Sequence, residues 1–210
     1  MSESEETTIV ETQKPKPWDS AALVLAIVLG IAAACFTVGR AVVRVIQIAS
    51  NRDVPITAAF ADTPATLPIG PDGVQVEVVA QEVIFRASDL PVITLVSLIL
   101  AEVVFALAAV VTIVFVCLVI RNVIRGRAFM RQNVAYVGWA TLAGVFGWLL
   151  TWLFTTMGAN GGSSALANGN ATNTSFEIEP LTIFVIASLG VLVVAFQAGH
   201  RLQRDTAGLV

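Results

Sequence analysis

Four long apolar runs constrain the fold of this chain more than any other feature. They span about residues 20–39, 91–120, 134–157 and 180–198. Each is about as long as an α-helix needs to be to cross roughly 30 Å of hydrocarbon. Only 13% of the 210 residues are charged, whereas a soluble domain carries about 25%. The sequence therefore predicts an all-α membrane protein, a bundle of four transmembrane helices.

The segments between the runs give the predicted organisation. Residues 1–18 carry acids, then lysines between prolines, and are typical of a disordered tail. We expect a membrane domain at 19–200 and a second tail at 201–210. The helices of this domain are expected at about 20–45, 91–122, 133–157 and 179–201.

Residues 51–90 form a long polar loop between the first two runs. Asp72-Gly73 is a turn signal, and valines alternate with Gln75 and Glu77 after it, as in a strand. We expect a small β-containing element here, a hairpin with the segment 56–61. The Gly-, Ser- and Asn-rich stretch 158–179 is instead predicted to be a flexible loop.

The distribution of basic residues predicts the orientation in the membrane. The loop between the second and third runs has no acid and four arginines: Arg121, Arg125, Arg127 and Arg131. The loop between the third and fourth runs has Glu177 and Glu179 but no basic residue. By the positive-inside rule, the arginine-bearing loop and both termini are cytoplasmic, and the loop 51–90 is outside. The Ala- and Val-rich composition is typical of a bacterial plasma membrane protein.

Glu102 is the one acid embedded in an apolar run. Arg40 lies twenty residues along the first helix from Ser20, and Glu102 lies nineteen residues from Arg121, so both reach nearly the same height. Arg44 follows Arg40 by one turn, on the same face. We therefore expect an intramembrane ion pair of Glu102 with Arg40 and Arg44. It is either a structural link between two helices or a proton or cation site in a carrier.

The four arginines at 121–131 have two interpretations. They either set the topology and touch anionic lipid, worth ~1 kcal/mol per basic residue, or they dock an acidic cytoplasmic partner. Gly126 is a predicted helix break between them.

Enzymatic motifs are absent from the sequence. It has no nucleophile elbow, H-E-x-x-H motif, Walker sequence or haem-attachment pattern. The single histidine, His200, and two cysteines at different predicted depths make no zinc site. We therefore expect no catalytic, cofactor-binding or metal-binding residues. Direct nucleic-acid contact is not expected either, because the basic cluster is a short loop beside the membrane.

Two stretches, 119–144 and 191–210, carry a resemblance. The first has Gly126, Phe129 and Asn133 in a G-x-x-F-x-x-x-N-like step. The second closes the chain with five spaced residues: Gly199, Leu202, Asp205, Leu209 and Val210. Both resemble the bacterial membrane family called domain of unknown function twenty-nine seventy-five. The resemblance implies four spanning helices and a long first outer loop, and no activity. Some relatives are encoded beside a small helix-turn-helix regulator, which hints at tethering or sensing.

The expected function is that of a non-enzymatic membrane protein, an accessory, scaffold or sensory subunit that acts through protein partners and touches membrane lipids. The alternative is a small oligomeric transporter or channel that uses Glu102.

Overall fold

A computed structural model describes the chain over residues 17–68, 70–127 and 130–166, and at positions 184–185, 187–188, 190–191, 193–195 and 197–199. Three long helices and one two-stranded sheet make up the elements. Their order is α1 (Pro17–Ala49), β1 (Val54–Leu67), the 3-10 turn η1 (Pro71–Gly73), β2 (Val76–Ala87), α2 (Val92–Ile124) and α3 (Arg131–Leu166).

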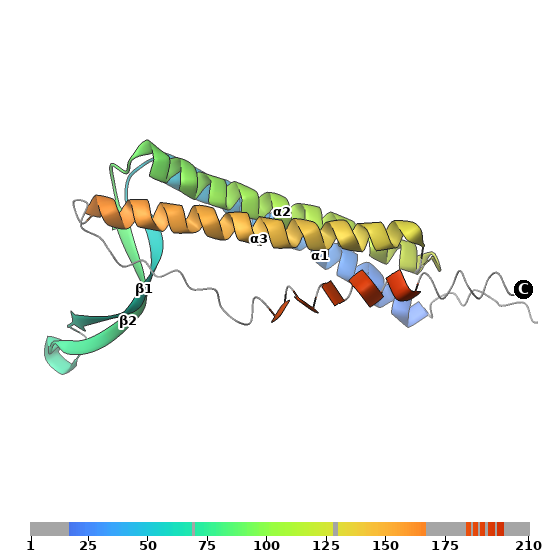
Figure 1. The fold of residues 1–210 in the computed structure, drawn as a ribbon, viewed down its shortest axis with the longest axis horizontal. Helices are drawn as coiled ribbons and strands as arrows, with labels where there is room; N and C mark the ends of the chain where they lie inside the picture. Colours follow the sequence, from blue (N-terminus) through green and yellow to red (C-terminus); the bar gives the residue numbers. More distant parts are fainter. Residues whose placement is uncertain are drawn as a thin grey trace, which may run out of the picture.

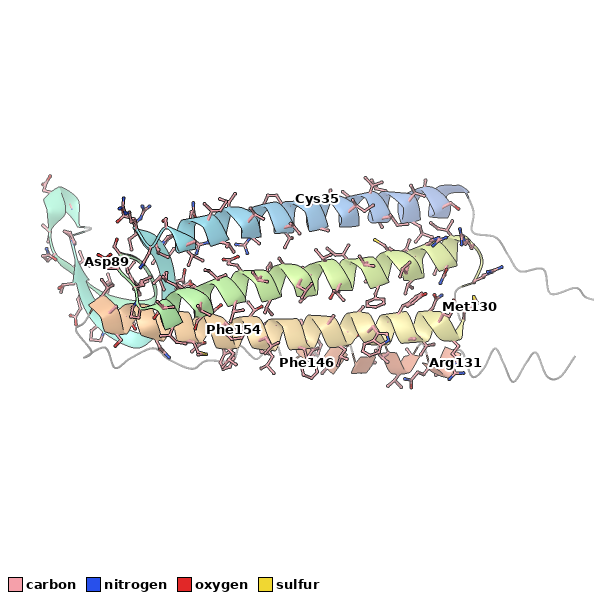
Figure 2. The ribbon with its side chains drawn as sticks, turned by 90° about the horizontal axis from the view of Figure 1, so that it is seen from above. Cys35, Asp89, Met130, Arg131, Phe146 and Phe154 are labelled. Carbon is pink, nitrogen blue, oxygen red and sulfur yellow. The ribbon has the colours of Figure 1, made fainter. Side chains whose placement is uncertain are left out.

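The three helices lie side by side as a layer with α2 in the middle (Figure 2). α2 contacts both α1 and α3 along its length. Each helix contains a segment long and apolar enough to cross a membrane: Ser20–Ala49, Val92–Ile124 and Arg131–Leu166. Large apolar side chains such as Phe36 and Leu107 point outward and are exposed, as lipid-facing residues would be. The fold is thus mostly helical and compatible with a membrane protein.

The fourth predicted helix is described in part. The described residues between 184 and 199 have helical backbone, and the Ser188 hydroxyl donates to the Phe184 carbonyl at 2.8 Å, as within a helical turn. Residues 1–16 of the predicted tail 1–18, the tail 201–210, the loop residues 167–179, His200 and the closing motif from Leu202 onward lie outside the described residues. Pro17 and Trp18 instead begin α1.

The third helix is longer than the sequence predicts. α3 continues to Leu166, so the prediction of a flexible loop is wrong for residues 158–166. A Cβ at Gly158 would collide with Leu98 of α2, and a Cβ at Gly161 would collide with Thr94. These glycines therefore let two helices approach closely. The packing outweighs the roughly 1 kcal/mol by which each glycine disfavours a helix relative to alanine.

The loop between α1 and α2 folds as the predicted hairpin, formed by β1, η1 and β2. The strands are antiparallel, with Val54 opposite Ala87 and Leu67 opposite Val76, and the register shifts between Ala59 and Thr63. The turn uses Asp72 and Gly73 at φ 56° and 78°, a left-handed conformation that Gly adopts freely and Asp tolerates. Figure 1 shows the hairpin at one end of the helices, bent away from their long axis.

The main apolar core of the described residues lies where the hairpin meets the helices. Its members come from all the long elements: Ile48, Val54, Ile56, Ala58, Ala87, Leu90, Leu98 and Ala159. A polar clasp closes the same junction. The Asn51 amide nitrogen donates to the Leu90 carbonyl at 3.2 Å, and its oxygen accepts from the Leu90 amide at 2.8 Å. The clasp holds together the two points where the chain enters and leaves the hairpin.

Candidate functional site

Glu102 lies between two arginines of the neighbouring helix. Arg40 Nη2 donates to Glu102 Oε2 at 3.2 Å, and Arg44 Nε donates to Glu102 Oε1 at 3.4 Å. The structure thus brings together the three residues that the sequence predicts at nearly the same height along their helices. Both carboxylate oxygens accept a charge-assisted hydrogen bond, the stronger kind of hydrogen bond in proteins.

The three side chains differ in how far they are shielded. Glu102 is 15% exposed, Arg44 27% and Arg40 47%. The Arg40 guanidinium also lies over the Phe105 ring, 5.5 Å from its centroid, a favourable cation–π distance. The acid is therefore the most shielded member, and Arg40 is the most open to its surroundings.

Arg44 reaches further than the sequence could indicate. Its Nη2 donates to the Pro55 carbonyl of β1 at 3.2 Å, and its Nη1 donates to Gln47 at 3.4 Å. One guanidinium therefore connects α1, α2 and the base of the hairpin. We call Arg40, Arg44, Glu102 and the Pro55 carbonyl the arginine–glutamate junction.

This geometry restricts the chemistry available to Glu102. A carboxylate whose two oxygens both face guanidinium groups is poorly placed to accept a cation or shuttle a proton. Within the described ranges, no group of three His, Cys, Asp or Glu residues is placed to hold a metal ion.

A groove that sequence reasoning missed runs between α2 and α3. It encloses about 650 Å³ and has Thr57 and Glu82 of the hairpin at one end. Trp148, Thr151 and Trp152 line it from α3, and the Thr151 hydroxyl is buried without a hydrogen-bond partner. The one available sequence signal was the spacing of these residues on one helical face, which sequence alone does not distinguish from ordinary packing. Glu102 does not line this groove.

The four predicted loop arginines lie at the end of the helices opposite the hairpin. Figure 2 shows Arg131 at this end and Asp89 at the other. All four arginines are exposed, and across the described part of the chain none of them forms an ion pair. We call the segment 121–131 that contains them the arginine loop. Its described residues present four exposed arginines, and its sequence contains no acid.

Two features hold the described residues on either side of positions 128–129 in the arginine loop. Gly126, at φ 71°, ends α2 as predicted: its amide donates to the Val123 carbonyl, and the Arg127 amide donates to the Asn122 carbonyl, the Schellman pattern. Asn133, fully buried, donates to the Arg127 carbonyl at 2.8 Å and accepts from the Asn122 side chain at 2.6 Å. These contacts hold the end of α2 and the start of α3 together.

Comparison with models of protein families, with curated proteins and with solved structures gives no match. The family resemblance stays a prediction.

Proposed function

We propose that this chain is a non-enzymatic integral protein of a bacterial plasma membrane that acts through protein partners, as an accessory, scaffold or sensory subunit. The observation that supports it is the arginine–glutamate junction. Because Arg44 contacts both Glu102 and the Pro55 carbonyl, a partner that displaces the hairpin base also perturbs the contact between α1 and α2. The junction therefore connects the hairpin to α1 and α2.

The proposed topology follows from the charges. In this proposal there are four spanning helices, the last at about 179–201, with the hairpin outside and the arginine loop and both termini in the cytoplasm. The three long apolar helices support the spanning part of this arrangement. The basic, acid-free arginine loop supports the orientation.

The hairpin has the properties of a contact surface. Val79 and Ile84 of β2 are 62% and 71% exposed, and a two-stranded ribbon in water is only marginally stable by itself. Pro55 and Pro64 have no backbone N–H, so β1 lacks a hydrogen-bond donor at these two positions, whereas β2 has no proline. The outer edge of β2 is therefore better suited to pair with a partner strand.

The alternative, a small oligomeric transporter or channel that uses Glu102, has less support. Both Glu102 oxygens are engaged by arginines, and the residue is absent from the wall of the α2–α3 groove. A carrier site would need the carboxylate to face a path that a solute can enter.

The test is purification of the full chain from its native membrane in mild detergent, with mass determination of what copurifies. We expect a stoichiometric protein partner that is lost with Val79→Asp, because this change puts a charge on an exposed apolar position. Glu77→Gln, on the same exposed strand, is the matched control and should retain the partner. Recovery of a homo-oligomer without a partner, together with solute flux in liposomes that Glu102→Gln abolishes, would overturn the proposal in favour of the carrier.

A further inference from the structure

A second groove lies between α1 and α2, toward the end that carries the arginine loop. It encloses about 430 Å³, and Ile27, Ile31 and Ala34 of α1 line it opposite Ile113, Cys117 and Arg121 of α2. Every lining side chain except that of Arg121 is apolar or a cysteine. Cys35 and Cys117 are both free and line this groove.

The groove lies beside a close contact of the two helices at Gly30. A Cβ at Gly30 would be 3.3 Å from the Cys117 sulfur and from Ile113, so α1 and α2 nearly touch there. An elongated apolar chain can lie along such a seam, whereas a polar solute has no hydrogen-bonding group in it apart from Arg121.

The polar end of the groove is cationic. Arg121 belongs to the last turn of α2, and the backbone amide of Arg125 donates to its carbonyl, so Arg125 stands one turn further on. No acid occurs between positions 121 and 131. The guanidinium groups therefore present uncompensated charge where the apolar part of the helix ends.

We propose that this groove binds an anionic phospholipid, with an acyl chain along the α1–α2 seam and the phosphate at Arg121 and Arg125. In a bilayer an acyl chain gains little by moving from other lipid tails to a protein groove. The preference for this lipid therefore comes from the headgroup, through the charge complementarity of arginine and phosphate. The inference rests on the membrane placement proposed above and is independent of any protein partner.

The test counts lipids that stay bound to the full chain. The protein is reconstituted in vesicles with equal amounts of phosphatidylglycerol and phosphatidylcholine, extracted in mild detergent and examined by native mass spectrometry. We expect bound phosphatidylglycerol to exceed phosphatidylcholine. Arg121→Gln should lower this preference about fivefold, the effect of one basic residue at an anionic surface. Arg127→Gln, an exposed arginine of the same loop that does not line the groove, should lower it less.

A second pair of variants tests the apolar half of the site. Ala34→Phe fills the groove without a change of charge and should displace the lipid while Arg121 is intact. Ala33→Phe, at an exposed neighbouring position outside the groove, is the control for folding and should retain it. Equal retention of both lipids by the wild-type chain, or equal losses with Arg121→Gln and Arg127→Gln, would overturn the proposal. Neither result bears on copurification of a partner through the hairpin.

Discussion

At the scale of single residues, Glu102 is the acid that both arginines of the junction share. Among the described residues it is the one acid that pairs with two arginines, so its removal leaves two positive charges of α1 close together beside α2. Arg40 is different, because it is the most exposed of the three and its guanidinium can find other partners at the surface. The three positions should therefore respond unequally to substitution.

We expect Glu102→Gln to lower the free energy of unfolding by about 2 kcal/mol, because two hydrogen bonds to a charged group are weakened. Arg40→Gln should cost about 1 kcal/mol or less, since its contact is half exposed. Thermal unfolding of the purified variants in one detergent measures both. Unchanged thermal stability of Glu102→Gln would contradict a structural role for the junction.

The sequence predicted three of the four members of this junction, Arg40, Arg44 and Glu102. The rise of a helix is constant, so the common level of Arg40 and Glu102 follows from counting residues. The contact of Arg44 with the Pro55 carbonyl could not be predicted in the same way. It depends on how the hairpin docks, which is decided by the core around Ile48 and Ile56 and by the Asn51 clasp. None of these leaves a periodic signal.

At the scale of elements, α3 shows why composition alone predicted a flexible loop where the chain is helical. Gly, Ser and Asn are common in flexible segments, and the stretch after Met157 is rich in them. In helices that pack closely the same small residues are favoured, because they let backbones approach. The same composition is therefore found both in flexible loops and in helices that pack against another helix. Here α2 is the neighbouring helix, and it contacts this part of α3 through Leu98 and Thr94.

Substitution by alanine at two glycines of α3 should change the stability of the protein in opposite directions. A Cβ at Gly147 would collide with Ala108, whereas a Cβ at Gly138 would meet nothing within 4 Å. We expect Gly147→Ala to destabilise the protein by about 1–3 kcal/mol, as overpacking does. Gly138→Ala should stabilise it by up to about 1 kcal/mol, because alanine favours helix. Thermal unfolding of the pair measures the difference, and equal shifts would argue against close α2–α3 packing.

At the scale of the whole molecule, the chain is polarised along its helices. One end holds the hairpin, the polar clasp and the main apolar core. The other end holds the exposed arginine loop. The middle is apolar on its outside, with grooves on either side of α2. Length and hydropathy predicted the three long helices. The layer with α2 at its centre also depends on close contacts at small residues such as Gly30, Gly147 and Gly158.

The proposed orientation makes this polarity testable in cells. Asp72 lies in the exposed turn of the hairpin and Arg127 in the exposed arginine loop, so cysteines placed there report the two ends. A membrane-impermeant maleimide should label Asp72→Cys in intact cells and label Arg127→Cys only after the membrane is opened. Cys35→Ser and Cys117→Ser in the background remove the native thiols. The reverse pattern would place the hairpin inside the cell, and the proposed partner would then have to be cytoplasmic.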